Sequence, residues 1–158
     1  MIFVECKPDR TLTQFLIENF PAEIVHSGNK PGVCKKLEKN QNCIGLIDED
    51  PNSVQPSYID NLELEYDLEQ FEIRVLKDQT NNNRLIILKP RLEEWIIATT
   101  RNCNIEMEPF GLDSNPHHLH SIINTSLDLF MELIVFLKDV IRAQSVLLLK
   151  RLLEGETL

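Results

Sequence analysis

The stretch Cys43-Ile44-Gly45-Leu46-Ile47-Asp48-Glu49-Asp50-Pro51 decides the fold class of this chain. Its first five residues show no alternation of polar and apolar side chains, and three acids and a proline end the run. A strand that is apolar on both faces is expected in a parallel sheet that helices cover on both sides. The stretch therefore predicts a central strand of an α/β domain, with carboxylates directly after its end.

The residues before this strand predict the element order β-α-β-α. Short apolar runs indicate buried strands, and apolar residues at helical spacing indicate the helices between them. A capping-box pattern and a proline at a first helical turn give the expected helix starts. The expected elements are a strand over residues 2–4, a helix from Thr11 to about Asn19, a strand over residues 22–26 and a short helix from Pro31.

The residues after the central strand predict a mixed, mostly parallel sheet. Residues 51–73 contain six acids and no Lys or Arg, and acids alternate with apolar residues from Leu62 to Glu69. This pattern favours an edge strand or loop with a solvated acidic face over a functional acidic surface. Two further strands are expected over residues 71–76 and 84–88, and their short link permits an antiparallel pair but not a helical crossover.

The rest of the sequence is expected to be helical. Pro90 opens a helix that is predicted to pack Trp95 on the sheet. Nothing breaks a helix over residues 117–154, so this part predicts one long helix or two stacked helices. We expect residues 1–105 to form the α/β domain and residues 106–158 to form a helical extension packed on the same domain.

The composition indicates one soluble domain in the cytoplasm. The N-terminal Met1-Ile2-Phe3-Val4-Glu5 has no basic region before its apolar residues and no small-residue cleavage site, so no secretory signal is expected. The apolar run over residues 127–137 is too short and too charged to predict a membrane span. A net charge of −9 disfavours binding to nucleic acid that depends on many Lys and Arg contacts. Nucleic-acid chemistry would need metal ions or a basic partner.

Three acids are the candidate site residues. Right-handed β-α-β connections place Glu5 and Asp48 at the carboxyl ends of parallel strands, and Asp50 follows two residues later. Carboxylates are the hard oxygen ligands that Mg²⁺ or Mn²⁺ prefers, and their mutual repulsion is costly without a cation or protons. If the three converge, they predict a metal site. Acids at strand ends are also common as solvated loop residues, so this simpler interpretation stays open.

Further candidates stand beside these three. Asp9 is either a helix N-cap or a metal ligand, and Glu93 either faces the metal or complements the dipole of its helix. Lys7 could contact a phosphate, although pairing with a neighbouring acid is favoured. Three histidines at the start of the last helical part do not predict a closed zinc site, because adjacent residues point to different helix faces: His117, His118 and His120.

Three short motifs resemble those of the Toprim domain. Val4-Glu5-Cys6-Lys7-Pro8-Asp9 is similar to the V-E-G-x-x-D opening of that family, and the strand ending in Asp48-Glu49-Asp50 is similar to its D-x-D motif. Pro90-Arg91-Leu92-Glu93-Glu94-Trp95 is similar to the P-x-L-E-x-W helix of small stand-alone bacterial Toprim-like proteins. The Toprim domain is the catalytic module of topoisomerases, primases, OLD-family nucleases and small RNA-maturing nucleases. The resemblance spans about residues 1–100.

The resemblance implies a Toprim-like (Rossmann-like) sheet and a metal-dependent activity. It implies that Asp48 and Asp50 bind Mg²⁺ or Mn²⁺, and that Glu5 shares the metal or serves as general acid or base. The metal would stabilise charge on the scissile phosphate and activate a water or hydroxyl group. The resulting expectation is a nuclease or phosphotransferase that acts on DNA or RNA, in a bacterial defence or repair assembly.

The alternative is a catalytically inactive Toprim-like module that binds a protein partner. The sequence has Cys6 where the family has glycine, and its charge balance gives no basic groove. A wide apolar stripe near the C-terminus adds the expectation of a homodimer or partner interface. The stripe consists of Leu147, Leu148, Leu149, Leu152 and Leu153.

Overall fold

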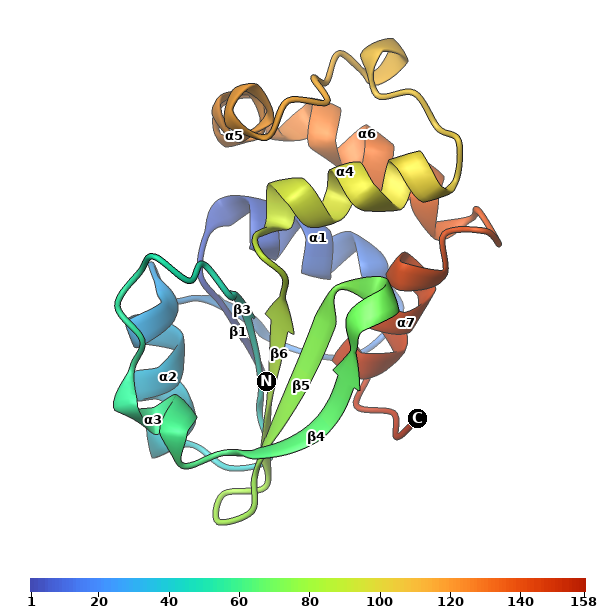
Figure 1. Cartoon of the computed structure of the whole chain (residues 1–158). Helices are drawn as coiled ribbons and strands as arrows, with labels where there is room; N and C mark the ends of the chain where they lie inside the picture. Colours follow the sequence, from blue (N-terminus) through green and yellow to red (C-terminus); the bar gives the residue numbers. More distant parts are fainter.

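A six-stranded mixed sheet lies at the centre of the protein (Figure 1), and the computed structural model describes all residues, 1–158. The strands are β1 (Ile2–Val4), β2 (Ile24–His26), β3 (Ile44–Asp48), β4 (Glu63–Leu68), β5 (Ile73–Asp78) and β6 (Asn83–Leu88). Their order is β2-β1-β3-β6-β5-β4. Strands β2, β1, β3 and β6 pair in parallel, whereas β5 pairs antiparallel with both β6 and β4. The prediction of a central parallel strand at β3 is confirmed.

Both faces of the sheet are buried, and neighbouring residues of a strand point to opposite faces. In β1, Val4 belongs to the larger hydrophobic cluster and Phe3 to the smaller one. In β3, Leu46 and Ile47 divide between the two clusters in the same way. Because neither face of β1 or β3 meets water, these two strands show no polar alternation, unlike the edge strand β4.

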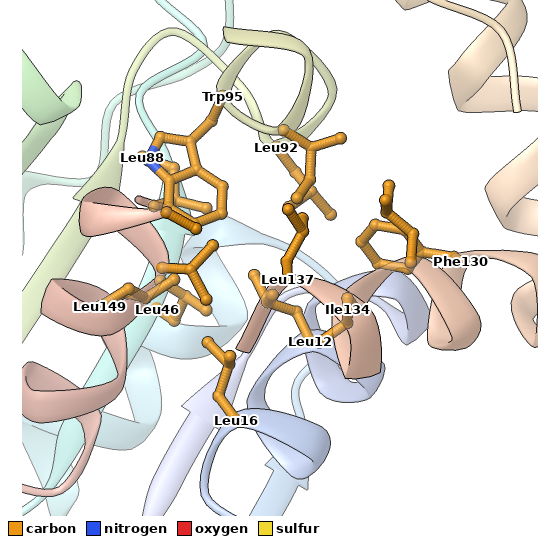
Figure 2. Packing of buried hydrophobic residues seen from close by; sticks show 14 of the residues in the cluster. Leu12, Leu16, Leu46, Leu88, Leu92, Trp95, Phe130, Ile134, Leu137 and Leu149 are labelled. Carbon is orange, nitrogen blue, oxygen red and sulfur yellow. The ribbon is translucent and has the colours of Figure 1, made fainter. Parts of the chain in front are cut away.

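Seven α-helices cover these faces (Figure 1). They are α1 (Lys7–Leu16), α2 (Lys30–Lys39), α3 (Ser57–Asp60), α4 (Leu92–Asn102), α5 (Pro116–Thr125), α6 (Leu127–Lys138) and α7 (Gln144–Leu153), with short 3-10 helices at Glu69–Phe71 and Glu108–Phe110. Helices α2 and α3 pack on the smaller cluster, and α1 and α4 to α7 pack on the larger one. Figure 2 shows Trp95 of α4 in this larger cluster, near Leu149 of α7. The predicted packing of Trp95 is confirmed, since it is 1% exposed.

The segments predicted downstream of β3 are also found. The strands β5 and β6 form the expected antiparallel pair, and the acidic alternating segment forms the edge strand β4. An ion pair between Arg84 Nη2 and Glu65 Oε1, 2.7 Å apart, ties this edge strand to β6. Helix α4 begins at Leu92, two residues after Pro90.

The first helix begins earlier than the capping pattern predicted. Helix α1 starts at Lys7, and Cys6 is its N-cap. Pro8 lies in the first turn, where its missing N–H removes no helical hydrogen bond. Asp9 is therefore not the N-cap: it lies inside the first turn, and its Oδ2 accepts hydrogen bonds from the Cys6 amide at 3.1 Å and thiol at 3.0 Å. The helix also ends early, at Leu16.

The C-terminal part forms three helices, so the expectation of one or two was wrong. Helices α5 and α6 meet at Ser126 with a bend of 108°. One straight helix over residues 117–154 would be about 57 Å long, too long to bury its whole apolar stripe on one small domain. No single helix is long and apolar enough to span a membrane; only the bent pair α5 and α6 has the combined length and composition.

Most of the leucine stripe of α7 packs inside the protein. Leu149, Leu152 and Leu153 are each 0% exposed and belong to the larger cluster, so they are not available to a partner. Leu147 and Leu148 are half-buried, so an interface through this part of the stripe stays a prediction. The width of the stripe reflects contact with both α1 and α6. The exposed large apolar residues of the C-terminal part lie elsewhere, in and after α6: Val135, Phe136, Ile141 and the terminal Leu158.

Substitution of two phenylalanines of α6 can test whether the helical extension shares one core with the sheet. Phe130 is 0% exposed and Phe136 is 47% exposed. We expect Phe130→Ala to lower the free energy of unfolding by about 3–5 kcal/mol, because it leaves a cavity in the shared core. Urea unfolding followed by circular dichroism should show one transition for both the wild type and this variant. Phe136→Ala is the matched control, with an expected change below about 1 kcal/mol. Two separate transitions would contradict a shared core.

Candidate functional site

The two predicted strand-end acids meet directly. Glu5 follows β1, and Asp48 ends the neighbouring parallel strand β3. The Asp48 backbone N–H donates to Glu5 Oε1 at 2.8 Å, and Asp48 Oδ1 accepts from the Leu92 backbone N–H at 2.9 Å. The Leu92 amide is one of the unpaired N–H groups at the start of α4. Asp48 thus uses one carboxylate oxygen inside the protein, and its Oδ2 makes no intramolecular hydrogen bond. The Glu5 carboxylate interacts with the backbone N–H groups of both Asp48 and Lys30.

The carboxylates around Asp48 repel one another in a partly dehydrated site. Burial is the main reason that the pKa of Asp48 rises to about 9, and the negative charge of Asp9 is the second largest cause. Burial also raises the pKa of Asp9 to about 7 and raises the pKa of Glu5. The negative charge of Glu93 also raises the pKa values of both Asp48 and Asp9. Four acids therefore share one electrostatic environment, and protons or a cation would relieve it.

Asp50 belongs to the same edge of the sheet but is less closely coupled. Its charge contributes to the raised pKa of Glu5, after larger contributions from burial and other groups. Its backbone N–H donates to the Pro90 carbonyl at 2.8 Å, and its φ of 32° lies in the left-handed region, which Asp adopts more readily than most residues. The Asp50 carboxylate makes no intramolecular hydrogen bond, so it is free to reorient toward a ligand.

The two further candidate acids, Asp9 and Glu93, both form hydrogen bonds within the protein. Asp9 is 2% exposed and accepts from Cys6, as described above. Glu93 is 7% exposed, and its Oε1 lies 2.6 Å from Nδ1 of His120 on α5. The other histidines do not join this pair: His118 Nδ1 lies 3.1 Å from Asp113 instead. The helical extension therefore reaches the acidic site through one histidine.

A buried lysine supports the loop that carries Asp50, although no sequence pattern singles it out. Lys30 is 4% exposed, and its ammonium donates to the Glu49 carbonyl at 2.6 Å, Ser53 Oγ at 3.0 Å and Gln55 Oε1 at 3.2 Å. Its charge also opposes the rise in the pKa of Glu5. A lysine at a helix start is ordinary in a sequence, so only the fold reveals this role.

Lys7, in contrast, does not play the role that the sequence favoured. It is exposed at the first position of α1 and forms no ion pair with a neighbouring acid. The expected pairing was wrong because Asp9 turns back toward Cys6 at the helix start. Lys7 is left free at the rim of the site.

The fit to a divalent cation depends on the chemistry of the carboxylates. No group of three or more His, Cys, Asp or Glu side chains is already arranged around one point. Asp48 nevertheless keeps a carboxylate oxygen without an intramolecular partner, beside Glu5 and in a site where anions repel. Mg²⁺ is commonly held by one or two carboxylates and several waters, so this set suits it. Asp50 could add a third oxygen.

No protein-family model, curated protein or solved structure matches this chain. The comparisons therefore assign neither a family nor an activity. The residues of the site and the motifs that contain them are the features of this chain that bear on its function.

The raised pKa of Asp48 predicts that the metal-free protein loses stability as the pH rises. Between 3.8 and about 9 the carboxyl group stays protonated in the folded protein but ionises in the unfolded chain, so the free energy of unfolding falls across this range. Asp48→Asn removes the effect and keeps an oxygen for the Leu92 N–H. At about pH 8 in EDTA, we expect the variant to be more stable by more than about 1.4 kcal/mol, the equivalent of one pKa unit.

Urea unfolding at several pH values measures this difference, which should shrink toward pH 5. Asp139→Asn, at an exposed position after α6, is the control and should leave the pH profile unchanged. A constant difference between Asp48→Asn and wild type at all pH values would show that Asp48 is ionised in the folded protein.

Proposed function

We propose that the protein is a Mg²⁺- or Mn²⁺-dependent nuclease or phosphotransferase of Toprim type that acts on DNA or RNA. The observation that carries the proposal is the contact between Asp48 and Glu5 at the carboxyl ends of adjacent parallel strands. In open α/β sheets, ligands bind in the crevice at this edge. The three motifs that resemble the Toprim domain all lie there.

The fold is consistent with the finer assignment to a Toprim-like sheet. The parallel order β2-β1-β3-β6 brings together the ends of β1, β3 and β6, which are followed by Glu5, Asp50 and α4 in turn. Each motif thus contributes to the same edge. This convergence supports the resemblance more strongly than any one motif does.

The proposed roles follow from the local environment of each acid. Asp48 and Asp50 would hold the metal, and Glu5 would share it or transfer a proton. The bound metal would supply charge stabilisation at the phosphate and a more acidic water. Burial raises the pKa of Glu5, which makes its carboxylate a better proton acceptor than an exposed one.

The alternative proposal is an inactive Toprim-like module that binds a protein partner, or a second copy of itself, through its C-terminal helices. Val135 and Phe136 of α6 and the nearby Ile141 expose apolar surface, and Phe136 packs against Phe110 with ring centroids 5.4 Å apart. The net charge of −9 also fits a module that does not approach nucleic acid by itself. A role in a defence or repair assembly is compatible with both proposals.

Thermal unfolding with and without millimolar MnCl₂ tests the metal site. A ligand at 100 times its Kd stabilises the folded state by about 2.7 kcal/mol. For a chain of this size, that corresponds to a rise in Tm of about 5–10 °C. We expect this rise for wild type and for Asp139→Ala, and we expect Asp48→Ala to lose it.

A cleavage assay completes the test, with labelled single- and double-stranded DNA and RNA in the same buffers. Metal-dependent cleavage by the wild type that Asp48→Ala abolishes would establish the enzyme. Absence of both the metal response and cleavage would instead support the interaction module.

A further inference from the structure

A polar pocket lies beside the acidic site, between the N-terminal ends of α4 and α5. Its volume is about 380 Å³, and none of its lining residues is hydrophobic. The lining residues are Arg91, Glu93, Glu94, Asn115, Pro116, His117 and His120. Charged and polar side chains line this pocket, although Pro116 and the carbon atoms of these side chains contribute apolar surface, and the polar atoms can hold a charged or hydrated group.

This pocket and the acidic site have a wall in common. Glu93 lines the pocket and also raises the pKa of Asp48 through its charge. Arg91 and Glu93 flank Leu92, whose backbone N–H donates to Asp48 Oδ1 at 2.9 Å. The hydrogen bond to Glu94 is the main reason that the pKa of the Arg91 guanidinium rises, and the charges of Asp50 and Glu93 add to the rise. A ligand that reached from the acidic site past Glu93 would therefore enter the pocket.

The pocket contains free hydrogen-bond donors beside two acids, each of which uses one oxygen for a basic partner, and Glu94 Oε2 is buried without a hydrogen-bond partner. Glu93 Oε1 lies 2.6 Å from His120 Nδ1, and Glu94 Oε1 lies 2.8 Å from Arg91 Nη2. The Nε and Nη1 groups of Arg91 make no intramolecular hydrogen bond, and its side chain is 52% exposed. The His117 ring also has no hydrogen-bond partner in the protein and is exposed.

We propose that this pocket binds the phosphate next to the reacting one on a single strand of nucleic acid, with Arg91 and His117 as the donors. An arginine fork matches the geometry of phosphate oxygens and stays charged at any working pH. One arginine and one histidine in a single pocket can contact one phosphate, which suits one strand rather than the two phosphate rows of a duplex. The inference rests on the proposed function and adds the binding mode of its substrate.

The pocket offers a way for this acidic protein to bind a polyanion. With a net charge of −9, the protein as a whole repels a polyanion. One local contact beside a metal-bound phosphate needs no basic groove. Binding should therefore depend on few phosphate contacts and show a shallow dependence on salt.

The test is fluorescence anisotropy of a short labelled single-stranded DNA and of the matching RNA, in millimolar CaCl₂ at several salt concentrations. We expect Arg91→Gln to raise the Kd about 10-fold and to reduce the slope of log K against log salt by about 0.7, the value for one phosphate contact on a single strand. His117→Ala should raise the Kd about 3-fold. Melting temperatures in EDTA check that both variants are folded.

Two matched controls separate this pocket from general electrostatics. Arg101→Gln removes the same charge from an exposed position at the other end of α4. His118→Ala removes the neighbouring histidine, which contacts Asp113 and does not line the pocket. Both controls should bind as the wild type does.

Equal Kd values and salt slopes for Arg91→Gln and Arg101→Gln would overturn the pocket proposal. Absence of any wild-type binding would overturn it as well, if MnCl₂ still stabilises the protein. If the proposed function itself is wrong, MnCl₂ will not raise the melting temperature of the wild type. This result differs from those that would overturn only the pocket proposal. Weaker binding in Arg91→Gln with an unchanged MnCl₂ effect supports the pocket.

Discussion

The two hydrogen bonds of Asp48 hold together three elements that are distant in the sequence. Its backbone N–H reaches Glu5 after β1, and its carboxylate reaches the Leu92 amide at the start of α4. The geometry of the sheet edge depends on this residue, although burial and like charge make its ionised form costly. A costly ionisable group of this kind is typical of functional sites, where burial and neighbouring charges shift pKa values.

The central sheet was predictable because its strands are continuous apolar runs. The run before Asp48 could only suit a strand with both faces buried, and the short link between β5 and β6 left only an antiparallel pair. The meeting of Glu5 and Asp48 followed from the handedness of β-α-β connections. These are rules of local pattern and chirality, which a single sequence carries.

The features that were missed depend on contacts between distant segments. Nothing in the sequence marks the break at Ser126, since no glycine or proline stands there, and packing on the core decides it. The contact of His120 with Glu93 requires the position of α5 relative to α4. The start of α1 has a local reason: the capping-box pattern predicts a start at Thr11, but Pro8 is compatible with a first helical turn, so the helix begins at Lys7.

The buried ammonium of Lys30 has a consequence for how a ligand would meet the site. Each of its three protons has an oxygen partner in residues 49–55, so moving that loop would leave a charge without solvation. The loop is consequently ordered before anything binds. A cation arriving at Asp50 would have to fix only side-chain rotamers, and the entropy cost of ordering the backbone would already have been met during folding.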